Sequence, residues 1–134
     1  MRGSPLTGRS GRVVIGTLLL PMVLACGSVG LGASRTSATA GVTISTAAGE
    51  TTVFDPTRAS VKADGPITVT FQNGSALPHN LTFTGTLTAA TRTIVDPGAS
   101  EELRLAPLAP GSYPFVCTIH DGMAGTLLVE SAVP

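Results

Sequence analysis

From residue 42 to residue 130 the chain alternates short runs of β-forming residues with clusters of turn-forming residues. The runs are Val42–Thr46, Thr51–Phe54, Ala59–Lys62, Ile67–Gln72, Leu81–Thr84, Arg92–Val95, Glu101–Leu105, Ser112–Cys117 and Gly125–Glu130. Between them lie strong turn formers such as Asp64-Gly65-Pro66, Asn73-Gly74-Ser75 and Asp96-Pro97-Gly98. No window of useful length has the helical period of 3.6. This spacing predicts an all-β sandwich.

Alternation within the runs predicts which side chains face the core, because residues two apart in a strand share a face. Ile67, Val69 and Phe71 form one such apolar set. Cys117 has the parity of Tyr113 and Phe115, and His79 has that of Leu81 and Phe83. A cysteine and a histidine from two different strand ends are therefore both predicted to point inward.

The first part of the chain has the features of an export signal. Residues 1–12 carry three arginines and no acid, and residues 13–24 form an apolar run too short to span a bilayer. Val23-Leu24-Ala25-Cys26 resembles the lipobox of bacterial lipoproteins, which implies cleavage before Cys26 and lipidation of its thiol. The alternative is an ordinary signal peptide cut near Ala25, with Cys26 left as a free thiol.

These features divide the 134 residues into three parts. Residues 1–25 are the expected signal peptide, residues 26–40 a lipidated Cys26 followed by a flexible tether of small residues, and residues 41–134 one small domain. The protein is therefore expected to be exported and anchored by lipid on the extracytoplasmic or periplasmic side of the cell membrane. One acyl chain binds membranes only marginally, so stable anchoring needs the several chains of a bacterial lipoprotein.

The composition of the exported part argues against nucleic-acid binding and limits its disulfides. Three of the eight basic residues lie in the leader, so five remain beyond Cys26 against eight acidic residues. The five aromatic residues do not alternate with Lys or Arg, and no basic stripe suggests nucleic acid. With Cys117 as its only cysteine the domain has no internal disulfide, although pairing with Cys26 stays open if Cys26 is not lipidated. We expect a monomer.

Soft and borderline donor side chains are concentrated in one short stretch. Beyond Cys26 the chain has one Cys, one Met and two His, and three of these four lie at Cys117, His120 and Met123. A thiolate, two imidazoles and a weak thioether form the donor set typical of type 1 copper. The fourth donor, His79, would come from a second loop at the same end of the sandwich. Gly122 and Gly125 are expected to supply the flexibility that the tight loop after Cys117 needs.

Two other interpretations compete with a copper site. Zinc also takes Cys and His, but a thioether is an unusual zinc ligand. Each residue could instead be ordinary, because a lone Cys or Met in a β domain is most often a buried apolar residue. That interpretation requires all four donors to fall by accident where one copper site needs them.

The two segments that carry the donors resemble the cupredoxins, and most closely their plastocyanin and amicyanin branch. The segments are Asn73 to Asn80 and Gly111 to Gly125, and the resemblance extends over about Val42 to Val133. It implies an eight-stranded Greek-key β-sandwich with one copper ion, cycling between Cu(I) and Cu(II), under one end. His79, Cys117 and His120 would form a trigonal plane, with Met123 as the axial ligand.

The resemblance also implies roles for residues around the ligands. Asn80 matches the residue that ties the two ligand loops together, bonding near Thr118, and its backbone N–H would donate to the sulfur of Cys117. Ile119 occupies a position often filled by Pro in this branch, so its N–H could give the thiolate a second donor. Such contacts hold ligands in place and tune a metal.

These observations predict a one-electron transfer protein rather than an enzyme. Redox partner proteins would dock briefly on an apolar patch around His120, formed by Leu77, Pro78, Ile119 and Ala124. The alternative is an envelope lipoprotein that sequesters or delivers copper without a dedicated redox partner. A metal-free interaction module anchored by lipid is the third reading.

Overall fold

The computed structural model describes residues 37–132, and in that range every regular element is a β-strand. The strands are β1 (Ala40–Thr46), β2 (Phe54–Asp55), β3 (Arg58–Ala63), β4 (Ile67–Asn73), β5 (Thr82–Phe83), β6 (Ser100–Leu105), β7 (Gly111–Val116) and β8 (Ala124–Ser131). The expected signal peptide, Cys26 and most of the expected tether lie outside the described residues. Residues 37–132 contain no helix with the length and apolar character needed to cross a membrane.

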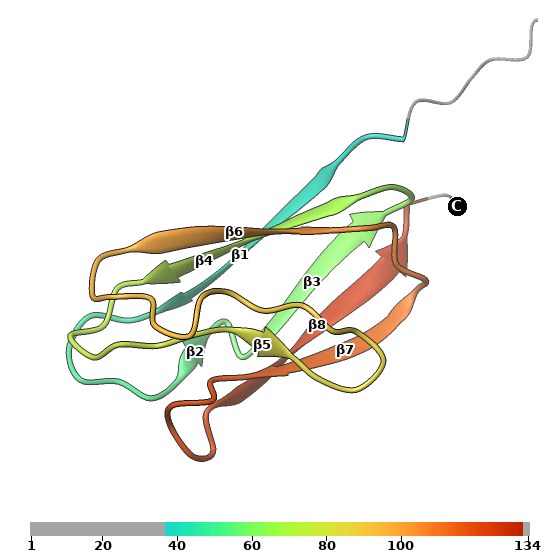
Figure 1. The fold of residues 1–134 in the computed structure, drawn as a ribbon. Helices are drawn as coiled ribbons and strands as arrows, with labels where there is room; N and C mark the ends of the chain where they lie inside the picture. The colour runs from blue at the N-terminus through green and yellow to red at the C-terminus, as the bar shows by residue number, and fades with distance from the viewer. Residues whose placement is uncertain (1–36, 133–134) are drawn as a thin grey trace, which may run out of the picture. The chain divides into compact units, whose positions relative to one another are not determined.

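The strands form two four-stranded sheets that face each other, as Figure 1 shows. One sheet has the order β2-β1-β4-β6 and the other the order β3-β8-β7-β5. The β1–β4 and β3–β8 pairs are parallel, and the other pairs are antiparallel. Neighbours in each sheet are mostly not consecutive in the chain, so the connections pass between the layers. The predicted Greek-key sandwich of about eight strands is confirmed.

The core lies between the inner faces of the two sheets. Ile67, Val69 and Phe71 of β4 have no exposed surface, as their shared parity predicts. Phe115 of β7 comes from the opposite sheet, and the ring of Phe54 contacts it edge-on with centroids 5.0 Å apart. Phe54 also meets Phe71 edge-on at 6.0 Å, so this one aromatic ring joins the two layers. The core thus supports the strand ends from which the donor residues emerge.

The predicted strand Arg92–Val95 is wrong, and the register explains why. Single antiparallel bridges pair His79 with Val95 and Thr82 with Ala90, with a backbone bond from the Thr91 N–H to the Leu81 carbonyl between them. Residues 79 to 81 on one side therefore lie opposite residues 91 to 95 on the other, which has two extra residues. A ladder cannot continue across that mismatch, so the segment bulges instead of forming a strand.

Two other predicted strands are present but shorter than expected. The run Thr51–Phe54 is reduced to the two residues of β2, and Leu81–Thr84 to the two residues of β5. In the first, the Val53 N–H bonds to the hydroxyl of Thr51 rather than to a neighbouring strand. Local side-chain bonds of this kind compete with sheet pairing.

Candidate metal centre

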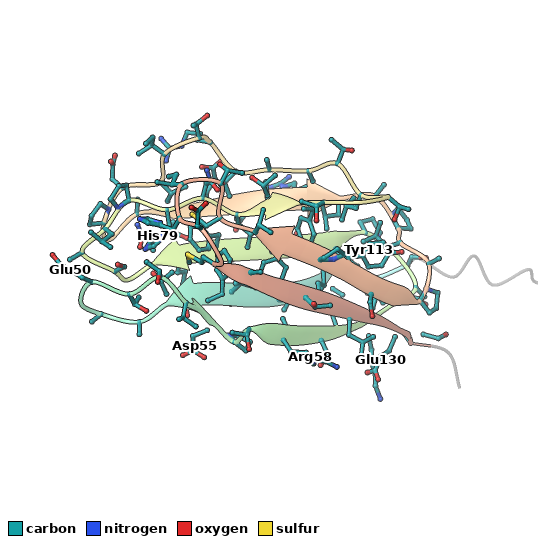
Figure 2. All side chains as sticks on the ribbon, turned by 90° about the horizontal axis from the view of Figure 1, so that it is seen from below. Glu50, Asp55, Arg58, His79, Tyr113 and Glu130 are labelled. Carbon is teal, nitrogen blue, oxygen red and sulfur yellow. The ribbon has the colours of Figure 1, made fainter. Side chains whose placement is uncertain are left out.

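Two connections at the same end of the sandwich bring the donor residues together. His79 lies in the segment between β4 and β5, and Cys117, His120 and Met123 lie in the turn between β7 and β8. We call residues 74–81 the His79 segment and residues 117–123 the Cys117 loop. Figure 2 shows His79 near one end of the molecule, close to Glu50, with Tyr113 and Glu130 toward the other end.

The donor atoms converge as the sequence predicts. One ligand atom each of His79, Cys117 and His120 lies within 4.8 Å of the other two. The sulfur of Cys117 is 3.8 Å from Nδ1 of His79 and 3.6 Å from Nδ1 of His120. The two imidazole rings face each other at an angle of 51°, with centroids 4.6 Å apart. Both histidines therefore present the same ring nitrogen to one sulfur.

These distances fit a single shared metal ion. Bonds of about 2.3 Å to sulfur and about 2.0 Å to nitrogen, at roughly 120° to each other, separate the two donors by about 3.7 Å. The two sulfur-to-nitrogen distances of 3.6 and 3.8 Å bracket that value. The Cys117 side chain is a free cysteine and is 4% exposed. A thiolate and two imidazoles in this arrangement suit a soft or borderline first-row metal.

His79 is the buried member of the set. It has no exposed surface, and its Nε2 has no hydrogen-bond partner. Burial lowers the pKa of His79, and repulsion from His120 lowers it further, while the Thr51 backbone has a smaller, opposite influence on that pKa. The Thr51 backbone nevertheless does not reach hydrogen-bonding geometry with Nε2. A lowered pKa keeps the imidazole neutral, which is the form that binds metals.

Two backbone hydrogen bonds close the Cys117 loop. The Cys117 N–H donates to the carbonyl of Met123 at 3.0 Å, and the Met123 N–H to that of His120 at 3.4 Å. Gly122 has φ +76°, a left-handed conformation that favours glycine. Met123 is 2% exposed, so its thioether faces inward, whereas His120 is half-buried.

Gly125 has a different role from the loop flexibility expected of it. It belongs to β8 rather than to the loop, opposite Phe115 of β7. A Cβ placed there would collide with the Phe115 ring and would lie 2.8 Å from the carbonyl oxygen of Thr57. Glycine is required at this position because a core ring occupies the space of a side chain.

Asn80 joins the two donor segments, as the resemblance implies. Its Oδ1 accepts the Thr118 N–H at 2.8 Å, and its Nδ2 donates to the Thr118 hydroxyl at 2.7 Å and to the Thr93 carbonyl at 2.9 Å. Asn80 is 2% exposed, whereas Thr118 is exposed, so the bonds to Thr118 run from a buried residue to the surface of the loop. The proposed N–H donors from Asn80 and Ile119 to the Cys117 sulfur stay predictions.

The residues expected around His120 are at least partly accessible. Leu77 and Pro78 are half-buried, and Ile119 and Ala124 are exposed. Ile119 is 37% exposed and is one of three exposed large apolar side chains in the described part of the chain, with Val53 and Ile94. We call these four residues the His120 patch.

We compared the sequence with models of known protein families. The model of the cupredoxin-like domain matches residues 18–129. The chain belongs to the cupredoxin-like domain family. A comparison with curated proteins finds no match.

Several solved cupredoxin structures resemble the fold. Dithionite-reduced auracyanin from Roseiflexus castenholzii is 28% identical, with a TM-score of 0.57 over 67% of this chain and 96% of that one. Auracyanin A of Chloroflexus aurantiacus, described as a "blue" copper protein, is 20% identical, with a TM-score of 0.57 over 69% and 100%. The reduced Cu(I) form at pH 4 of an amicyanin mutant is 25% identical, with a TM-score of 0.54 over 67% and 82%.

Sequence reasoning missed one buried polar residue beside the cupredoxin site. Asn73 is 1% exposed, and its amide bonds to four groups. A signal was available, because Asn73 continues the inward parity of Ile67, Val69 and Phe71. Its neighbours Gly74 and Ser75 instead led to its interpretation as part of a turn.

Proposed function

We propose that this cupredoxin is a one-electron transfer protein that binds one copper ion through His79, Cys117, His120 and Met123. The observation that carries the proposal is the convergence of three donor atoms within 4.8 Å, with both Cys–His distances suited to one ion. The resemblance to amicyanin, whose reduced Cu(I) form has been solved, supports the choice of metal.

Copper in such a site supplies a single electron by alternating between Cu(I) and Cu(II). The contribution of the chain is to hold the donors in one arrangement for both states. His79 is kept neutral by burial, and Asn80 bonds the Cys117 loop to the His79 segment. Fixed donors limit the rearrangement that accompanies electron transfer, which suits a carrier better than an enzyme.

The His120 patch is the proposed docking surface for redox partners. His120 is half-buried at the edge of the site, and Ile119 and Ala124 next to it are exposed. Transient redox encounters use small interfaces, so a limited apolar surface is sufficient. The protein would act as a monomer, with electrons passing through the exposed edge of the His120 ring.

Membrane anchoring through Cys26 is a further part of the proposal. The lipobox-like Val23-Leu24-Ala25-Cys26 supports it, together with the run of small residues that precedes β1. Anchoring would hold the copper domain on the extracytoplasmic side of the membrane. Replacing Cys26 by Ser should release the protein from membranes without changing the spectrum of its copper-loaded form.

Copper exchange and electron exchange separate a carrier from a copper-handling protein. We expect the copper-loaded protein to lose metal slowly to a chelator while NMR line broadening in mixtures of oxidised and reduced protein reveals rapid electron self-exchange. The Cys117→Ser variant is the control for metal held outside the site. Rapid copper loss combined with slow electron exchange would instead indicate copper delivery or storage.

A further inference from the structure

The amide of Asn73, at the end of β4, is fully engaged in hydrogen bonds. Its Nδ2 donates to the carbonyls of Leu77 at 2.8 Å and Val95 at 2.9 Å. Its Oδ1 accepts the Thr46 hydroxyl at 2.9 Å and the Ser75 N–H at 3.1 Å. Two carbonyls on one side and two donors on the other determine which way the amide points. The side chain therefore has one orientation, and four groups depend on it.

The two carbonyls bound by the amide nitrogen both belong to the surroundings of His79. Leu77 lies two residues before His79 in the chain. Val95 pairs with His79 through two backbone bonds, from the His79 N–H at 3.2 Å and to the His79 carbonyl at 2.8 Å. The Val95 carbonyl thus accepts from both the His79 backbone and the Asn73 side chain. Asn73 joins the donor residue, its bridge partner and the end of β4.

The His79 ring has little else to fix its position. Its Nε2 has no hydrogen-bond partner, and its Nδ1 faces the Cys117 sulfur. The orientation of the ring therefore depends on its packing and on the backbone to which it is attached. That backbone is held from one side by Asn80 and from the other by Asn73.

We propose that Asn73 is a positioning residue for His79, acting through the carbonyls of Leu77 and Val95. This inference rests on the proposed copper function. Asn80 links the His79 segment to the Cys117 loop, whereas Asn73 links the His79 segment to the end of β4. Without the Asn73 amide the carbonyl of the half-buried Leu77 loses a donor, and the Val95 carbonyl keeps only the His79 N–H. The His79 backbone then gains freedom, and the ring moves with it.

The network offers a matched control, because the amide nitrogen of Asn73 bonds to carbonyls near His79 and the amide oxygen bonds to Thr46 and Ser75. The Thr46 hydroxyl bonds to the oxygen side of the amide and accepts the Ser75 N–H. Thr46→Val removes those bonds from a buried site but leaves both amide-nitrogen bonds in place, with the Ser75 N–H still available to Oδ1. Asn73→Leu has a similar shape to the wild type but removes both bonds to the carbonyls. Both variants should lower stability, and only Asn73→Leu should disturb His79.

The first measurement uses the metal-free protein. Hydrogen exchange of the His79 N–H, relative to an amide in the middle of β4, should be about tenfold faster in Asn73→Leu, the effect of losing roughly one hydrogen bond. Thr46→Val should leave that ratio unchanged. Equal ratios in the two variants would overturn the proposal. If Asn73→Leu does not fold, Asn73→Ser replaces it, because a hydroxyl is too short to bridge both carbonyls.

The second measurement uses the copper-loaded protein. Asn73→Leu should shift the copper EPR and visible spectra and slow electron self-exchange, while Thr46→Val keeps both close to wild type. Spectra and exchange rates that are the same in both variants would contradict a positioning role. A wild type that binds no copper would instead remove the proposed function, and hydrogen exchange in the metal-free protein would still decide what Asn73 does.

Discussion

His79 lies on a backbone held by buried side chains, whereas His120 lies on a short and largely exposed loop that only one buried side chain, Asn80, is seen to hold in the described residues. Asn73 and Asn80 fix the His79 segment, and both are almost completely buried. In the Cys117 loop, Thr118, Ile119, Asp121 and Gly122 are exposed, and His120 is half-buried. One side of the site thus sets the geometry, and the other gives access. A carrier needs both, because donors must stay fixed while one edge remains open to a partner.

The largest expected effect comes from removing each imidazole in turn. His120→Gly should lose the wild-type spectrum and recover most of it with free imidazole, because solvent reaches the opening. His79→Gly should not be rescued in the same way, because its site is completely buried. Absorption titrations with imidazole measure both. Equal rescue of the two variants would show that the contrast in access is wrong.

The next largest effect concerns the link between the two segments. Asn80→Leu removes three hydrogen bonds and leaves the Thr118 N–H and the Thr93 carbonyl without partners, so it should reduce the free energy of unfolding by about 2–4 kcal/mol. Thr118→Val removes only the hydroxyl partner and should cost about 1 kcal/mol. Urea denaturation of the metal-free proteins compares them. Equal losses would mean that Asn80 does not connect the segments energetically.

A smaller effect is expected from pH on the metal-free protein. The lowered pKa of His79 means that the unfolded chain binds more protons than the folded one below the usual histidine pKa of about 6.5. Stability should therefore fall as pH decreases from about 6.5 toward the folded-state pKa, by at most about 1.4 kcal/mol per pH unit for this one group.

The control for this pH effect is His79→Gln, which cannot titrate. Its free energy of unfolding should depend less steeply on pH across the same range. If the wild type and His79→Gln have the same pH dependence, burial does not perturb His79 as described.

The smallest effect should come from Met123. Met123→Leu conserves volume in a buried position, so it should cost less than about 1.5 kcal/mol of stability. Because the axial bond in a type 1 site is long and weak, the variant should keep copper and colour and shift the reduction potential upward. Voltammetry provides the measurement. Complete loss of copper would show that the thioether is a principal ligand.

Local pattern was sufficient to predict the inward-facing donors, and it failed where the register depended on distant contacts. Parity placed Cys117 with Phe115, and His79 with Leu81 and Phe83, and all five are buried. The run Arg92–Val95 looks like a strand by itself. Inside the bulge the Thr93 carbonyl accepts from Asn80, a contact that no short window contains.

Asn73 and Gly125 illustrate the same limit in another form. An asparagine followed by glycine usually indicates a turn, and only the folded sandwich surrounds Asn73 with two donors and two carbonyls. Gly125 was interpreted as a flexible loop residue, but the Phe115 ring across the β7–β8 pair explains it. The metal donors could be predicted from the sequence because they depend on residue type. The roles of Asn73 and Gly125 could not, because they depend on packing partners that are distant in the sequence.

The visible absorption spectrum of the oxidised, copper-loaded protein tests the central claim most directly. A thiolate from Cys117 bound to Cu(II) beside His79 and His120 should give an intense blue colour by sulfur-to-copper charge transfer, and Cys117→Ser should abolish it while the fold is retained. A colourless wild type that nevertheless holds copper, or a blue colour that survives in Cys117→Ser, would contradict the site described here.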